Sequence, residues 1–119
     1  MRFLSMVKID ARDTNCRPSE KLMADMGRLI DEMTRAGTLI ETAGLKPLAD
    51  GVRVKLEKGG RITVVDGPYA EAKEVIGGYA ILEATSKAHA IELTRRFLEV
   101  HGTEWDLECE VRQLEMPPQ

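Results

Sequence analysis

The segment from Arg2 to Ile9 constrains the fold more than any other, because its apolar residues do not follow a single alternation. Successive side chains of a β-strand point to opposite faces of the sheet, so a strand here is largely apolar on both faces. The alternate residues form two sets, Phe3, Ser5, Val7 and Ile9 on one face and Leu4, Met6 and Lys8 on the other. This pattern is typical of an interior strand that is covered on both sides.

Two segments carry the signals of amphipathic helices, since their apolar residues recur at intervals of three and four. The first has Ser19 as its N-cap and runs to about Ala36, and the second is capped by Thr85 or Ser86 and runs to about Val100. The first helix carries a methionine-rich apolar stripe, which we expect to lie in the core.

The remaining apolar runs are predicted strands. They cover residues 38–45, 52–56, 62–65, 76–84 and 107–114, and the second and third of them form a β-hairpin. With this hairpin as an insertion, the order is the βαββαβ of a ferredoxin-like α+β fold, with four antiparallel strands and both helices on one face. Gly78 and Ala80 should let a helix or another backbone approach closely.

Length and charge limit the remaining classes. At 119 residues we expect a single domain over 1–119, and a formal net charge of -3 gives no basic surface for nucleic acid. Cys16 and Cys109 have no CxxC spacing, so we expect reduced thiols. No apolar run approaches the roughly 20 residues of a membrane span, and no signal-peptide pattern is present. We therefore expect a cytoplasmic protein without membrane contacts.

Two helices cover only one face of such a sheet, although the strands around Met6 and Tyr79 are apolar on both. A second copy of the chain is the simplest cover for the other face, because a two-fold axis brings identical surfaces together. We therefore predict a homodimer.

The turn Asp66-Gly67-Pro68 marks the candidate site, because it bends the chain between two apolar runs. The loop that follows presents Tyr69, Glu71 and Lys73 at the end of a strand, where loops often carry ligands and reactive groups. We expect a small molecule to bind in a pocket beside this loop.

Two interpretations stay open for each of these residues. Asp66 is either a general base or the acceptor that caps its own turn. Tyr69 either donates its hydroxyl to a substrate or packs its ring. Glu71 and Lys73 either contact the ligand or belong to a solvated charged loop.

Two candidates lie elsewhere in the chain. His101 is either an acid–base group or a cap at the end of the second helix, where a protonated ring suits the helix dipole. Arg112 either holds an anionic ligand or pairs with Glu110 or Glu83 across the sheet. No spacing of His, Cys and carboxylates indicates a metal site, and we expect neither a metal nor a cofactor.

Three motifs together resemble the YCII-related family, in particular its DGPF-type members. They are residues 66–74, then Gly77-Gly78-Tyr79, and finally Glu110-Val111-Arg112. Members of that group have a DGPF-AETKE-like motif, a GG-aromatic strand and a terminal E-[IV]-R strand. The resemblance covers nearly the whole chain, with Tyr69 where Phe is usual and Ala72 where Thr is usual.

The resemblance implies a ferredoxin-like protomer in a dimeric α+β barrel. Some relatives have a His and an Asp proposed as an active pair, some carry out lyase-type dehydrochlorination of aromatic substrates, and others occur beside sigma factors. One hypothesis is therefore a metal-free lyase or isomerase, with Asp66 as base and Tyr69 or Arg112 orienting a small substrate. The other is a non-enzymatic regulatory or ligand-binding dimer that works with a sigma factor. The residues leave open whether the chain is an enzyme.

Overall fold

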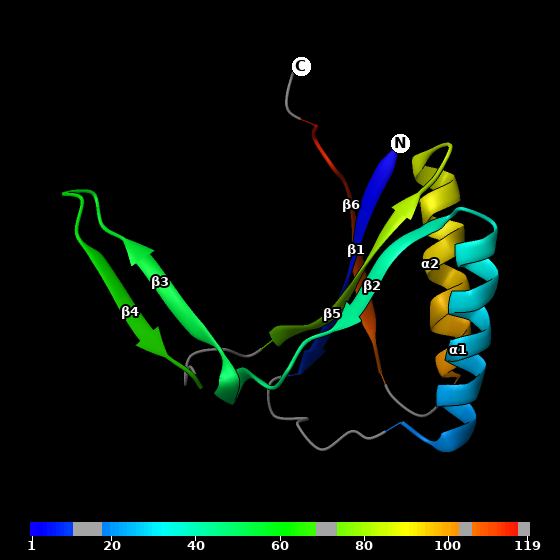
Figure 1. Ribbon diagram of the computed structural model, residues 1–119, viewed down its shortest axis with the longest axis horizontal. Helices are drawn as coiled ribbons and strands as arrows, with labels where there is room; N and C mark the ends of the chain where they lie inside the picture. Colours follow the sequence, from blue (N-terminus) through cyan, green and yellow to red (C-terminus); the bar gives the residue numbers. More distant parts are fainter. Residues whose placement is uncertain (11–17, 69–73, 103–105, 117–119) are drawn as a thin grey trace.

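The computed structural model describes residues 1–10, 18–68, 74–102 and 106–116. The expected order of strands and helices is confirmed (Figure 1). The elements are β1 (Arg2–Asp10), α1 (Glu20–Arg35), β2 (Leu39–Gly44), the 3₁₀ turn η1 (Leu48–Asp50), β3 (Val52–Leu56), β4 (Ile62–Asp66), β5 (Glu74–Glu83), α2 (Lys87–His101) and β6 (Glu108–Gln113).

The main sheet has the strand order β2-β5-β1-β6, with antiparallel pairing throughout. Both helices cover the same face of this sheet (Figure 1). This arrangement is the predicted ferredoxin-like α+β fold, and β3 and β4 form the separate two-stranded sheet of the inserted hairpin.

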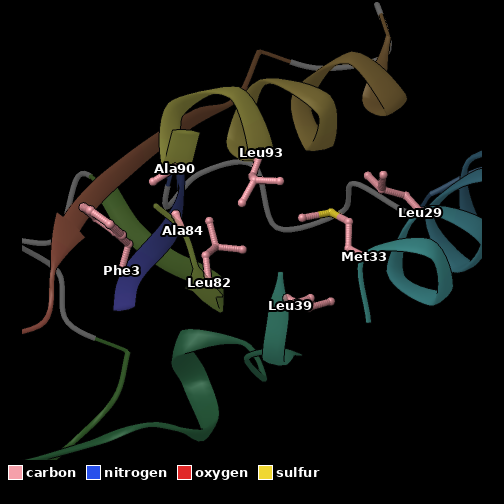
Figure 2. Packing of buried hydrophobic residues seen from close by; sticks show 8 residues of the cluster. All are labelled: Phe3, Leu29, Met33, Leu39, Leu82, Ala84, Ala90 and Leu93. Carbon is pink, nitrogen blue, oxygen red and sulfur yellow. The ribbon is translucent and has the colours of Figure 1, made fainter. Parts of the chain in front are cut away.

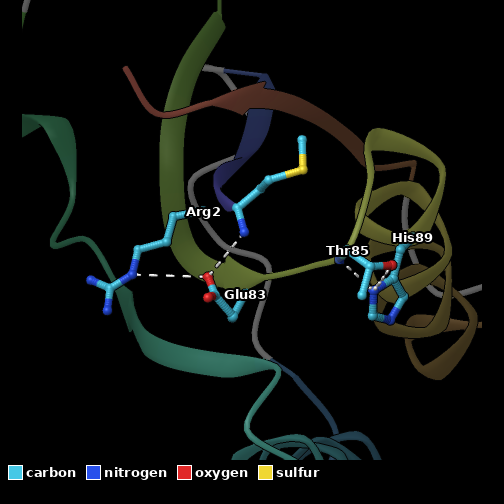
Figure 3. Close-up of polar contacts among 5 residues, drawn as sticks. Arg2, Glu83, Thr85 and His89 are labelled. Carbon is cyan, nitrogen blue, oxygen red and sulfur yellow. Dashed lines mark hydrogen bonds and ion pairs between the residues drawn. The ribbon is translucent and has the colours of Figure 1, made fainter. Parts of the chain in front are cut away.

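The helix starts follow from their caps. The hydroxyl of Ser19 accepts from the backbone N–H of Leu22 at 3.1 Å. The structure selects Ser86 as the cap of α2, where it accepts from the N–H of His89 at 3.1 Å. Thr85 instead donates its own N–H to Nδ1 of His89 at 3.0 Å (Figure 3). An N-cap of this kind contributes about 1 kcal/mol, because it satisfies one orphan donor of the first turn.

The core lies between the sheet and the two helices (Figure 2). Its tightest part joins β1, β5 and α2, where Phe3, Ala84 and Ala90 are almost completely buried. The small side chain of Ala90 is fully buried, which lets α2 lie close to the sheet at this end. Leu29 and Met33 bring α1 into the same cluster.

The pair Gly77-Gly78 produces an irregularity in the sheet. Val7 pairs with Gly78 whereas Lys8 pairs with Ile76, so Gly77 is an extra residue in β5. A Cβ on Gly78 would lie 3.1 Å from the carbonyl oxygen of Ala43. The expected close approach of another backbone is therefore confirmed, and that backbone is β2.

The β3–β4 hairpin, residues 52–66, projects away from the main sheet and is called the arm (Figure 1). At its base the N–H of Gly67 donates to the carbonyl of Gly51 at 2.9 Å. A Cβ on Gly67 would overlap the backbone carbonyl oxygen of Leu48 in η1. The turn after β4 therefore needs glycine for close packing against η1.

In the described part of the chain, neither helix combines the length and the apolar character that a membrane span requires.

Replacing Gly67 by Ala should destabilise the protein by roughly 1–3 kcal/mol, because the added methyl group meets backbone that cannot rotate away. Urea unfolding would measure the change. Gly59→Ala is the matched control, since a Cβ on Gly59 meets nothing within 4 Å. Equal stabilities of the two variants would show that the contact with η1 is not restrictive.

Candidate functional site

A cavity of about 690 Å³ lies between α1, α2 and the helix-covered face of the main sheet. Its wall on α1 is formed by Leu22, Met23 and Met26, and its opposite wall includes the glycines of β2 and β5. Phe97 and His101 of α2 also line it. The cavity is thus a gap inside the layer that the sequence pattern predicts to be core.

The cavity lies beside a part of the sheet that has few side chains to fill it. Leu29 and Met33, in the C-terminal half of α1, are buried against the sheet. The N-terminal half faces Gly44, Gly77 and Gly78, which have no side chains to fill the space. The closely packed backbones of β2 and β5 thus leave room above them.

The wall on α1 is adaptable as well as apolar. Met23 and Met26 have unbranched, polarisable side chains that can pack against ligands of different shape. We expected the methionine stripe to lie in the core, and that is correct for Met33, which is 5% exposed. Met23 is 62% exposed and lies at the border of the cavity.

Polar groups are few and lie at defined places. Ser5, in the floor, forms a buried hydroxyl pair with Thr94 at 3.3 Å. Thr42, on β2, donates its hydroxyl to the carbonyl of Tyr79 at 2.9 Å. A ligand would therefore meet mostly apolar surface with single hydroxyl groups.

His101 brings an imidazole ring to the wall of the cavity. Its Nδ1 lies 2.9 Å from the carbonyl oxygen of Phe97, and the two rings are tilted with their centroids 4.6 Å apart. Since a carbonyl only accepts, Nδ1 carries the proton and the lone pair of the neutral ring is on Nε2. The ring is thus fixed in orientation and tautomer, as an acid–base group requires.

Cys109 lies on β6 beside Ser5 and is a free thiol. Burial raises the pKa of the Cys109 thiol, and a hydrogen bond with Ser5 opposes this only in part. The thiolate is the reactive form of cysteine, so this side chain is a poor nucleophile at neutral pH.

Residues 1–102 match the family model of the YCII-related domain. The chain belongs to the YCII-related family. It is also 29% identical over 76 residues to an uncharacterised protein of Rhizobium meliloti (strain 1021). That match covers 64% of this chain and spans 60% of the length of the curated relative.

In this YCII-related chain the predicted site residues lie in different places. Asp66 is exposed at the end of β4, in the arm, and Arg112 is exposed on β6. Tyr69, Glu71 and Lys73 lie outside the described residues. His101 lines the cavity, and Asp66 and Arg112 do not.

Arg112 adopts one of the two arrangements considered from the sequence. Its Nε lies 3.1 Å from Oε2 of Glu110 on the same strand. Glu83 instead lies near the N-terminal amino group, at 3.7 Å, and near Nε of Arg2, at 4.0 Å (Figure 3). The ion pair with Glu110 is therefore confirmed, and a role of Arg112 in ligand binding stays a prediction.

The cavity itself was not predicted from the sequence. The Gly77-Gly78 pair was interpreted as part of a strand, with Gly78 allowing a helix or another backbone to approach closely. The relevant sequence signal is the group of three glycines, Gly44, Gly77 and Gly78, on two paired strands. They line the cavity opposite Met23 and Met26 of α1. Apolar periodicity indicates that a face is covered, but it does not show how closely the cover packs.

A charge cluster lies on the sheet face that carries no helix. The ammonium group of Lys8 is 2.8 Å from Glu110 and 3.7 Å from Glu74. The hydrogen bond to Glu110 is the main reason that the pKa of Lys8 is raised, and the same bond lowers the pKa of Glu110. The pair is solvent-accessible, so its contribution to stability is small.

The lowered pKa of Glu110 predicts the direction of an acid effect. The stabilisation is present above the pKa of Glu110 in the unfolded chain and is lost as pH falls through its lower pKa in the folded chain. Glu110→Gln should therefore be less stable than wild type at neutral pH, and the difference should disappear in acid. Denaturant unfolding across pH would measure this, with Glu99→Gln as the control. A difference that persists in acid would contradict the assignment.

Proposed function

We propose that this YCII-related protein binds a small, largely apolar molecule in the cavity between α1 and the main sheet. The cavity carries this proposal, because its volume of about 690 Å³ lies in the range of roughly 300–1,000 Å³ typical of ligand pockets. Apolar walls with a few placed polar groups are also typical of such sites.

The lining favours an aromatic ligand with one polar substituent. Phe97 offers a ring for stacking or edge contacts, and Met23 and Met26 offer sulfur–aromatic contacts. His101 would meet a hydroxyl substituent, since Nε2 of its neutral ring is a hydrogen-bond acceptor when Nδ1 donates to the carbonyl of Phe97.

The chemistry that these groups support is metal-free proton transfer, as in a lyase or an isomerase. His101 is the proposed acid–base group, since it lines the cavity with its tautomer fixed by the Phe97 carbonyl. Asp66 is the alternative base. It would act in the separate pocket that the sequence predicts beside the loop at 69–73. A regulatory ligand-binding protein, including one that works with a sigma factor, would use the cavity for binding alone.

We further propose that the chain is a DGPF-type member that acts in the cytoplasm as a dimeric α+β barrel. Support for the subtype comes from the Asp66-Gly67-Pro68 motif, whose glycine packs against η1. The free sheet face with Leu4 and Met6 supports the dimer, because two central apolar side chains lie there without helix cover.

Filling the cavity should weaken binding. Ala80 lies on the helix-covered face of β5 and lines the cavity, so Ala80→Leu should reduce the affinity for an apolar fluorescent probe such as anilinonaphthalene sulfonate about tenfold or more. Fluorescence titration would measure it. Ala88→Leu, on the exposed side of α2, makes the same chemical change away from the cavity and should bind normally. Normal binding by folded Ala80→Leu would place the ligand elsewhere.

Turnover should depend on His101. In a panel of chlorinated and hydroxylated aromatics, His101→Gln should lower the rate of any observed reaction by roughly 10²–10⁴-fold, as loss of a general acid–base group does. Asp66→Asn should retain activity. Activity that is lost in Asp66→Asn and retained in His101→Gln would assign the base to Asp66. Binding without turnover in the wild-type protein would favour the regulatory alternative.

A further inference from the structure

The exposed residues of the cavity lining lie on two segments of the chain. They are Pro18, Met23 and Gly27, at or just before α1, and Thr42, Ala43 and Gly44, on β2. The other lining residues are buried or half-buried. Since β2 is an edge strand of the main sheet, solvent reaches the cavity between α1 and this edge, within the described part of the chain. This opening is called the mouth.

The orientation of α1 agrees with this position of the mouth. Met23, Gly27 and Ile30 are spaced by four and three residues, so they lie on one side of the helix. Glu32 projects from the opposite side and forms an ion pair with Arg96 of α2 at 2.9 Å. The side that carries Gly27 is therefore turned away from α2 and towards the edge of the sheet.

The fold itself gives no reason for a glycine at position 27. Glycine in the interior of a helix is unfavourable, because it loses more backbone freedom on folding than any other residue. Among the described glycines, those with positive φ are Gly37, Gly60 and Gly102, so Gly27 has a conformation open to other residues. A Cβ on Gly27 would meet nothing within 4 Å, so close packing does not require glycine either. What distinguishes Gly27 is its place at the mouth.

We propose that ligands enter the cavity through the mouth and that Gly27 sets the thickness of the ligand that can pass. A side chain at position 27 would project on the same side of α1 as Met23 and narrow the opening towards β2. Without one, the mouth admits thicker molecules. This inference rests on the proposed function, because it requires a ligand in the cavity.

A residue that acts on the entry path changes rates and not affinity. A barrier in the mouth is crossed both on entry and on exit, so it lowers the association and dissociation rate constants by the same factor. The dissociation constant, which is their ratio, stays the same. This kinetic signature separates a residue at the mouth from one that holds the bound ligand.

Two ligands of different thickness test the proposal. 2-Naphthol is flat, whereas 1-adamantanol is a cage with the same number of carbon atoms and a single hydroxyl group as well. Stopped-flow fluorescence follows 2-naphthol directly, and competition gives the rates for 1-adamantanol. Gly27→Ala should slow 1-adamantanol about tenfold and 2-naphthol less than about twofold, whereas Gly27→Leu should slow both about tenfold or more. All dissociation constants should stay within about twofold of wild type.

The helix offers matched controls. Ala24 is exposed on α1 and does not line the cavity, so Ala24→Leu should bind both ligands at wild-type rates. Met23→Ala shortens an exposed side chain at the mouth and should speed both ligands. Gly27→Ala should also unfold at higher urea concentration than wild type, because alanine is the better helix former. Slower binding by this variant is then not a result of unfolding.

The results that contradict the proposal are distinct. Equal slowing of the two ligands in Gly27→Ala would show that backbone freedom, and not thickness, controls entry. Wild-type rates in Gly27→Leu, or weaker binding without slower association, would overturn the role of Gly27 while Ala80→Leu still abolishes binding. Normal binding by Ala80→Leu, or no binding by wild type, would instead refute the proposed function and this inference with it.

Discussion

The structure depends on the burial of one face of the β1–β5 pair. Phe3 and Leu82 pair across these strands and are 2% and 3% exposed, so each contributes roughly 1.5–3 kcal/mol through burial. The small side chains of Ala84 and Ala90 let α2 pack closely against Phe3 and Leu82. The distance between α2 and the sheet is therefore short at this end. At the other end Gly44, Gly77 and Gly78 have no side chains, and the cavity lies between them and α1.

Small residues therefore have opposite effects at the two ends of β5. Ala84, the residue after β5, and Ala90 of α2 are 3% and 0% exposed and belong to one buried cluster, so the layers are closely packed there. Where glycine faces the long side chains of Met23 and Met26, the backbones of β2 and β5 come together while α1 remains apart. The candidate site therefore lies beside the buried core cluster and extends over the glycines of β2 and β5.

Much of the fold could be predicted from local sequence signals. The caps Ser19 and Ser86, the hairpin turn and the alternation of β1 each depend on residues that are close in the chain. The cavity could not be predicted in this way, because it results from the distance between α1 and strands far away in sequence. The arm was predicted as a hairpin, but its separation from the main sheet depends on η1 and on the contact of Gly67 with Leu48.

The arm and the cavity share a backbone connection. Gly44 and Gly77 line the cavity, and the N–H of Leu45, the next residue after β2, donates to the carbonyl of Gly77 at 2.9 Å. The chain then continues through η1 to Gly51, which holds Gly67 at the base of the arm. Backbone hydrogen bonds therefore connect the base of the arm and the end of β2 that lines the cavity to neighbouring parts of the same chain segment, residues 44–51.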